Sequence, residues 1–198
     1  MLSEATFEND PIAQFASWYA EACAVELPLP QAVALATATP SGRSSLRMVL
    51  LKDFDARGFV FYTNYRSRKA VELARNPRAS LLFHWKRLER QVRIEGAVRR
   101  VSRKESDEYF KTRARGSQVG AWASPQSAVL ADRADLDRRF EAAGVKFPHH
   151  VPRPAHWGGY RLAPVLIEFW QGREDRLHDR LCFTLGRNGR WRLQRLAP

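Results

Sequence analysis

The feature that most constrains the fold is a series of short β-like runs joined by turns too short to hold a crossover. Residues 32–39, 44–52 and 59–62 form three such runs, separated by Pro40-Ser41-Gly42 and by residues 53–58. Connections of this length join antiparallel neighbours, because parallel strands need a crossover of a dozen residues or more. The sequence therefore predicts an antiparallel sheet.

Helices are expected where a capping residue precedes an apolar pattern of helical period. They are predicted over residues 11–25, 68–75, 102–113 and 125–144. Asp10 followed by Pro11 is typical of a helix start. Ser102 and Glu105 form a capping box for the third helix, and Ser124 precedes the fourth.

The later strands are predicted over residues 79–85, 91–101, 160–162 and 165–171, followed by a C-terminal hairpin. Gly96 indicates a β-bulge and Asn188-Gly189 a hairpin turn. Antiparallel strands with a few inserted helices predict an α+β fold, mostly antiparallel, as a closed or nearly closed barrel. We expect a single domain over residues 1–198, with the N-terminal helix at about 10–25 and C-terminal strands over about 158–198.

The charge of the chain indicates an anionic partner. The formal net charge is +12 and the pI is about 10.5, which suits nucleic acid, a membrane surface or a phosphorylated small molecule. The chain has no P-loop and no GxGxxG between a strand and a helix, which excludes common NTPase and dinucleotide-binding domains. His149, His150 and His156 have no cysteine or carboxylate at metal-ligand spacing, so no metal site is expected.

Cysteine content and the N-terminal residues predict a cytoplasmic protein. Cys23 and Cys182 are too few for a disulfide framework. The first ten residues lack the basic start and apolar core of a secretory signal, and no apolar run is long enough to span a membrane. We therefore expect a soluble protein with no membrane partner.

Residues 168–180, EFWQGREDRLHDR, form the first candidate site. If residues 176–180 are extended, Arg176, His178 and Arg180 lie on one strand face, with Leu177 and Asp179 on the other. Two guanidinium groups and an imidazole can bind an anion and exchange a proton. The alternative is a solvated, arginine-rich strand.

A second candidate site lies between the runs at 44–52 and 59–62 and the helix after them. Backbone N–H groups at a helix N-terminus, with nearby cations and a hydroxyl, can cradle a phosphate. The side chains that could do so are Arg47, Lys52, Tyr62, Thr63, Arg68 and Lys69. The alternative is an ordinary basic surface turn.

A third, smaller anion site is suggested by Tyr109, Arg113 and Ser117. Residues four apart lie on one helical face, and each of these side chains can donate a hydrogen bond. The same spacing is common on helix surfaces.

With these residues in view, the chain resembles the pyridoxine/pyridoxamine 5'-phosphate oxidase family from about residue 10 to the C-terminus. The resemblance lies in six blocks that occur in the family's order. They are RMVLLK (47–52), FYTN with SRKA (61–70), LERQVRIEG (88–96), SQVGAWASPQS (117–127), WGGYR (157–161) and EFWQG with RLHDR (168–180).

The resemblance implies an FMN-binding split β-barrel that forms a homodimer, with FMN in clefts between the subunits. The implied FMN contacts are Arg47, Met48, Val49, Leu50, Leu51, Lys52, Tyr62, Thr63, Arg68, Lys69, Gln91, Gln126, Ser127, Trp170 and Arg180. The implied substrate contacts are Lys52, Tyr109, Arg113, Ser117, Arg176, Leu177 and His178.

The resemblance also implies a reaction, in which phosphorylated B6 vitamers are oxidised to pyridoxal 5'-phosphate and O2 is reduced to hydrogen peroxide. The protein would supply binding and orientation. Arg176 is expected to hold the substrate, because a guanidinium stays protonated in proteins. His178 can either orient the substrate or accept a proton, and the sequence leaves both roles open.

Other interpretations follow from the same sequence. Family members commonly carry a longer basic N-terminal arm that folds over substrate, so we expect that lid to be missing or supplied otherwise. A related FMN oxidase of the phenazine-biosynthesis type, acting on another anionic ring, is the first alternative. The second is a basic nucleic-acid-binding barrel; the oxidase interpretation predicts no nucleic-acid partner.

Overall fold

The computed structural model describes residues 2–25 and 29–198, which form five α-helices and nine strands. The strands are β1 (Ala32–Ala38), β2 (Ser44–Leu50), β3 (Asp53–Asp55), β4 (Gly58–Asn64), β5 (Arg78–Trp85), β6 (Arg90–Arg100), β7 (Trp157–Gln171), β8 (Asp179–Leu185) and β9 (Trp191–Arg195). The helices are α1 (Pro11–Ala24), α2 (Arg68–Arg75), α3 (Arg103–Thr112), α4 (Arg115–Ala123) and α5 (Arg133–Lys146), with 3-10 turns at Lys86–Leu88 and Glu174–Arg176.

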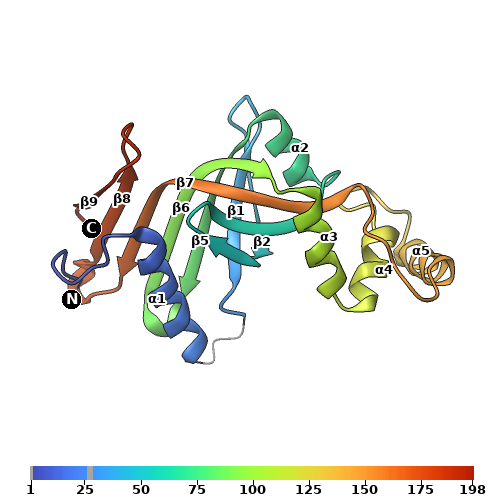
Figure 1. Cartoon of the computed structure of the whole chain (residues 1–198), viewed down its shortest axis with the longest axis horizontal. Helices are drawn as coiled ribbons and strands as arrows, with labels where there is room; N and C mark the ends of the chain where they lie inside the picture. Colours follow the sequence, from blue (N-terminus) through green and yellow to red (C-terminus); the bar gives the residue numbers. More distant parts are fainter. Residues whose placement is uncertain (1, 26–28) are drawn as a thin grey trace.

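One antiparallel sheet holds all nine strands, in the order β2-β1-β5-β6-β7-β4-β3, with β8 pairing β7 and β9 pairing β8. β7 is long enough to pair with β6 along its length and with two strands on its other side, β4 at its start and β8 at its end. The sheet curls (Figure 1), and Lys52 N donates to Val60 O at 2.9 Å, which links the end of β2 to β4. The predicted α+β split barrel is confirmed.

α1 packs its apolar face onto the curled sheet. Asp10 Oδ1 accepts a hydrogen bond from Ile12 N at 2.9 Å, so the predicted cap is present. Phe15 is fully buried, and its ring centroid lies 4.9 Å from that of Phe59 and 5.1 Å from that of Phe83. Burying one such ring stabilises the fold by about 1.5–3 kcal/mol.

A bulge lets a proline lie inside β7. The register of β6 and β7 shifts between Glu95 and Gly96, and Gly96 pairs with Pro164. Pro164 has no N–H to donate, and a β-bulge is a place where a strand tolerates that loss. A Cβ on Gly96 would lie 2.0 Å from Ala163 O, so this position needs glycine. The bulge at Gly96 is confirmed, whereas the two strands predicted over 160–162 and 165–171 form one continuous strand.

Two further sequence predictions are wrong in detail. The turn expected over residues 53–58 contains the short strand β3, which pairs with β4. The helix expected over 125–144 begins late, as α5, because Ser124 adopts an extended conformation and ends α4, a helix that the sequence did not predict. α5 begins only after Asp132, whose side chain accepts a hydrogen bond from Asp135 N at 2.7 Å.

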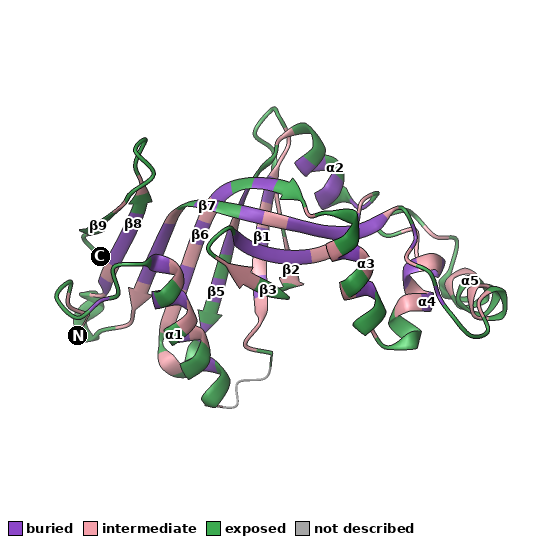
Figure 2. Cartoon of the chain, in the orientation of Figure 1, coloured by how far each residue is buried: buried purple, intermediate pink, exposed green. Residues whose placement is uncertain are grey.

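The molecule has two dissimilar ends. α3, α4 and α5 gather beyond the start of β7, whereas β8, β9 and both chain termini lie at the other end (Figure 1). Burial follows the central strands, and α5 contains no buried residue (Figure 2). The predicted hairpin turn is confirmed, with Gly189 at φ +75° between β8 and β9. No helix in residues 2–25 and 29–198 has the length and apolar character needed to cross a membrane.

Candidate active site

A cleft of about 620 Å³ lies where β2 and β4 face α3 and α4. It is lined by Met48, Val49, Leu50, Lys52, Tyr62, Thr63, Asn64, Lys69, Tyr109, Arg113, Ala114, Ser117, Gly120, Ala121, Ser124, Gln126 and Trp157. The second and third candidate sites of the sequence therefore share one cleft.

The first turn of α2 contributes a buried lysine. Lys69 is 7% exposed, and its Nζ donates to Thr63 Oγ1 at 3.1 Å and to Ser67 Oγ at 3.3 Å. Burial lowers the pKa of Lys69, and the nearby charge of Arg47 lowers it further. Ser67 holds the N-cap position but makes no side-chain cap hydrogen bond. A desolvated ammonium held by two hydroxyl groups suits an incoming anion.

The turn after α4 folds against the same helix end. Gln126 Oε1 accepts from Thr63 Oγ1 at 3.2 Å, and Ser127 Oγ accepts from Arg68 N at 3.2 Å. Ser127 has φ +75°, a conformation that costs a non-glycine residue energy and is often found at functional sites. Tertiary contact thus joins residues about sixty positions apart that were predicted to bind one cofactor.

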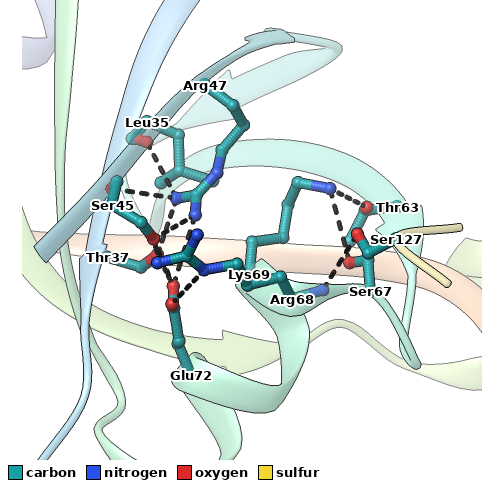
Figure 3. A network of polar contacts seen from close by, with 10 residues as sticks. All are labelled: Leu35, Thr37, Ser45, Arg47, Thr63, Ser67, Arg68, Lys69, Glu72 and Ser127. Atoms are coloured by element: carbon teal, nitrogen blue, oxygen red, sulfur yellow. Dashed lines mark hydrogen bonds and ion pairs between the residues drawn. The ribbon is translucent and has the colours of Figure 1, made fainter. Parts of the chain in front are cut away.

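Two arginines beside α2 share one carboxylate (Figure 3). Glu72 Oε2 lies 3.2 Å from Arg47 Nη2, and Glu72 Oε1 lies 3.0 Å from Arg68 Nε. Thr37 Oγ1 and Ser45 Oγ also donate to Glu72 Oε2, at 2.5 and 2.6 Å. Burial alone would raise the pKa of Glu72, but these four hydrogen-bond donors lower it to about 2. The carboxylate is therefore charged near neutral pH.

Stacked aromatic rings form another wall of the cleft. The Tyr62 and Tyr109 ring centroids are 3.9 Å apart, and those of Tyr62 and Trp157 are 5.5 Å apart. Lys52 Nζ lies 5.9 Å from the Tyr109 ring centroid. Burial, with the negative charge of Glu105, raises the pKa of Tyr62 to about 12, so its phenol stays protonated.

Arg113 presents an unsatisfied donor beside these rings. Its guanidinium lies 4.4 Å from the Trp157 ring centroid, and its Nη1 is buried without a hydrogen-bond partner among residues 2–25 and 29–198. Burial lowers the pKa of Arg113. Buried donors are nearly always satisfied in folded proteins, so an anion would complete this position. Ser117, on the first turn of α4, lines the same cleft.

Three residues of the RMVLLK and SRKA blocks that were predicted to bind the cofactor do not line the cleft. Arg47 points its guanidinium to Glu72, and Leu51 is buried in the core. Arg68 borders a neighbouring hollow of about 480 Å³ together with Ser127 and Arg43. Of the three, Arg68 lies in the first turn of α2, and Arg47 reaches the same helix through Glu72.

A separate group of predicted residues lies on the β6-β7-β8 part of the sheet. Gln91 pairs with Trp170, and Trp170 pairs with Arg180 on the next strand. The ring centroids of Trp170 and His178 are 4.6 Å apart. Arg180 Nε lies 2.8 Å from Glu168 Oε1. None of these residues lines the cleft.

The extended strand expected over residues 176–180 is wrong. Glu174–Arg176 form a 3-10 turn in which Asp175 and Arg176 have φ of 53° and 61°, and β8 begins only at Asp179. Arg176, His178 and Arg180 therefore do not share a strand face, because the chain must turn tightly to return β8 alongside β7. Leu177 is exposed, and His178 Nδ1 accepts from Arg173 N at 3.1 Å.

Sequence reasoning missed Glu72 and Trp157 as parts of this region. Glu72 lies four residues after Arg68 on a predicted helix, a spacing that favours an ion pair. Trp157 occurs in the WGGYR block, but only the tertiary structure brings it to Tyr62.

Comparison with known proteins agrees with the six sequence blocks. Residues 19–146 match the family model described as pyridoxamine 5'-phosphate oxidase. Residues 157–198 match the model described as pyridoxine 5'-phosphate oxidase C-terminal dimerisation region. A pyridoxine/pyridoxamine 5'-phosphate oxidase of Cupriavidus necator is 55% identical over 197 residues, covering 100% of this chain and 93% of the relative. One of Trichormus variabilis is 53% identical over 198 residues, covering 100% and 92%.

Solved structures show the same fold. PhzG from Burkholderia lata 383, in complex with tetrahydrophenazine-1-carboxylic acid, has a TM-score of 0.94 and 34% identity, covering 100% of this chain and 98% of that one. A pyridoxamine 5'-phosphate oxidase-related, FMN binding protein from Nostoc punctiforme has a TM-score of 0.77 at 16% identity, covering 96% and 98%, and supports the fold alone. From the two family models and the full-length relatives, this chain belongs to the pyridoxamine 5'-phosphate oxidase family.

Proposed function

We propose that this protein oxidises pyridoxine 5'-phosphate and pyridoxamine 5'-phosphate to pyridoxal 5'-phosphate. FMN, when bound, supplies the two-electron acceptor for the substrate C4' carbon and passes the electrons to O2, giving hydrogen peroxide. The protein's own residues bind both phosphates and orient the substrate. The relatives at 52–55% identity over the whole chain carry this activity in their names.

The α2 N-terminus fits the cofactor phosphate. The buried Lys69 Nζ donates its hydrogen bonds to two hydroxyl groups and not to a carboxylate. Arg47 and Arg68 lie beside it. Thr63 and Ser127 add hydroxyl groups at the same place. We assign to FMN the full set given by the resemblance, in which Met48, Val49, Leu50, Lys52, Tyr62 and Gln126 come from the cleft.

The unpaired Nη1 of Arg113 is the observation that supports assigning a second phosphate to this cleft. This atom is buried in the cleft wall and has no partner in the part of the chain that the structure describes. A phosphate ester oxygen there would receive a charge-assisted hydrogen bond. Tyr109, Ser117 and Lys52 line the same cleft and can donate to that anion. Two phosphate-binding groups in one cleft suit a phosphorylated cofactor and a phosphorylated substrate together.

The remaining residues are supplied, in our proposal, by a second copy of the chain. The match of residues 157–198 to a dimerisation region supports a homodimer. Leu46 and Met48 on β2 are 70% and 63% exposed, which provides an apolar surface beside the cleft. Gln91, Trp170 and Arg180 would complete the FMN contacts from the partner, and Arg176, Leu177 and His178 the substrate contacts.

Arg176 would orient the substrate and not act as a base, because guanidinium stays protonated. His178 Nδ1 accepts from the backbone of Arg173, which leaves Nε2 as the atom to hold the substrate or exchange a proton. We place the enzyme in the cytoplasm as one FMN-binding domain over residues 1–198, where a reducing medium suits the free thiols of Cys23 and Cys182.

An aerobic assay with pyridoxine 5'-phosphate tests the proposal, with aldehyde and peroxide followed together. We expect yellow protein with a flavin spectrum and equal amounts of both products. Colourless protein that takes up no added FMN and binds nucleic acid with steep salt dependence would contradict the proposal and favour the nucleic-acid barrel.

One alternative has a specific observation in its favour. PhzG, with a TM-score of 0.94, is described in complex with tetrahydrophenazine-1-carboxylic acid. A flavin-loaded protein that gave neither aldehyde nor peroxide from pyridoxine 5'-phosphate would favour an anionic ring of that kind as substrate.

A further inference from the structure

Glu72 is a buried acid inside a group of cations. It is 5% exposed, and it contacts two of the arginines assigned above to the cofactor phosphate. A carboxylate should repel a phosphate, so its presence there needs a reason. We propose that Glu72 is a positioning residue that holds Arg47 and Arg68 in the arrangement that receives the cofactor phosphate. This inference rests on the proposed function.

The two oxygens of Glu72 divide their contacts between two structural elements. Oε1 binds Arg68 on its own helix, and Oε2 binds Arg47 on β2 (Figure 3). Arg68 uses its Nε for this contact, which leaves its terminal nitrogens to an anion. Because Glu72 lies on α2 and Arg47 on β2, their ion pair fixes the position of α2 relative to β2.

Two hydroxyl groups hold the carboxylate in place. Thr37 Oγ1 and Ser45 Oγ donate to Glu72 Oε2, and Arg47 in turn donates to both hydroxyl oxygens, at 2.6 and 2.5 Å. Thr37, Ser45, Arg47 and Glu72 therefore each contact at least two others of these four. Such a network limits the rotamers of Arg47 before any ligand binds, so less side-chain entropy is lost on binding.

The charges of the group match a phosphate dianion. Arg47, Arg68 and Lys69 carry three positive charges, and Glu72 removes one of them. A phosphate monoester carries about −1.5 to −2 at pH 7. Without Glu72 the three cations would repel one another in a partly buried place, as the effect of Arg47 on the pKa of Lys69 indicates.

Substitution Glu72→Gln separates positioning from simple repulsion. The amide keeps the length of the side chain and loses the charge. If Glu72 positions the arginines, FMN should bind at least about tenfold more weakly, while riboflavin, which has no phosphate, should change less than about twofold. If Glu72 merely opposes the phosphate, the variant should bind FMN more tightly, and that result would overturn the inference.

The measurement is flavin binding to the full-length, flavin-free protein, with FMN and riboflavin titrated in parallel. Asp55→Asn is the matched control, because Asp55 also contacts two arginines, Arg57 and Arg161, away from the cleft. Its ratio of FMN to riboflavin affinity should equal that of the wild type. Equal weakening of both flavins by Glu72→Gln would show a purely structural role and overturn the inference.

A milder variant covers the case in which Glu72→Gln does not fold. Ser45→Ala removes one hydrogen-bond donor to Glu72 and one acceptor for Arg47. It should weaken FMN binding a few-fold and leave riboflavin binding unchanged. No change in the FMN to riboflavin ratio would overturn the inference. A wild-type protein that bound FMN no better than riboflavin would instead remove the proposed phosphate site, and this inference with it.

Discussion

The cleft and the β7-β8 end of the molecule differ in how their cationic side chains are paired. In the cleft, Lys69 is held by hydroxyl groups, and Arg113 Nη1 has no partner among the described residues. At the β7-β8 end, Arg180 is paired with Glu168 and Arg173 with Asp179, each at 2.8 Å. The cleft is thus suited to anions, whereas at the other end Glu168 and Asp179 each pair with two arginines, beside aromatic rings and an exposed loop.

In the function proposed above, each end supplies half of a site. Trp157 lines the cleft at the start of β7, and Trp170 lies near the end of the same strand, roughly 40 Å of extended chain away. The two groups lie toward opposite ends of one molecule (Figure 1). A symmetric dimer can bring the β7-β8 end of one copy to the cleft of the other.

Mixing two inactive variants is the strongest test of whether the two ends of neighbouring subunits form one site. Arg113→Ala damages the cleft and Arg176→Ala damages the loop. In a mixed dimer one site receives both defects and the other receives none, so random pairing should restore about a quarter of wild-type turnover. Turnover of co-expressed, differently tagged subunits measures this, with each variant alone as control. No recovery would show that each site lies within one chain.

The two halves should also differ in what they bind. Arg176→Ala should lower turnover roughly 100-fold by misplacing the substrate, with little loss of FMN. Arg68→Ala should do the reverse and weaken FMN by about tenfold, the value of one charge-assisted hydrogen bond. Steady-state kinetics and flavin titration on both variants test this. Equal flavin loss in the two would contradict the division of the site.

Acid should weaken FMN binding because it protonates the phosphate of FMN, and not because it protonates a residue of the protein. The second phosphate pKa is about 6, so FMN affinity should fall about tenfold between pH 7 and pH 5. Glu72 stays ionised in this range because its pKa is about 2. At alkaline pH, FMN affinity should fall earlier than an ordinary lysine predicts, because the pKa of Lys69 is lowered. Riboflavin titrated over the same pH range is the control and should show neither change.

The smallest effect concerns the stability of the cleft itself. Lys69→Met should raise the free energy of unfolding of the flavin-free protein by about 1 kcal/mol, because it removes a desolvated charge. In the wild type, the unfolded chain binds more protons than the folded one between the lowered pKa of Lys69 and its unfolded value, so stability rises with pH there. Lys69→Met should lose this rise.

Urea unfolding at pH 7 and at about pH 10, close to the pKa of an unfolded lysine, tests that prediction. Lys111→Met is the control, because Lys111 is exposed and paired with Glu108. A Lys69→Met variant less stable than wild type would mean that the hydroxyl contacts of Lys69 outweigh its desolvation.

Local patterns predicted most of the elements correctly. Asp10-Pro11 started α1, Gly96 marked the bulge and Asn188-Gly189 turned the last hairpin, because each depends on the backbone preferences of a few adjacent residues. The same reasoning failed at Ser124-Pro125, where a valid helix-start pattern lies at the end of α4. There Ser124 is extended and its N–H donates to Gly120 O at 3.0 Å, so it ends α4 and starts no helix.

Short turns, caps and motif blocks are local features, and they were enough to predict the antiparallel barrel and the family. How the predicted site residues group depended on the three-dimensional fold. It joined Thr63 to Gln126 and Arg47 to Glu72, left Arg113 Nη1 without a partner, and separated Arg176 and His178 from the cleft. The physical reason is that charge pairing and burial depend on contacts between distant segments, which no local pattern specifies.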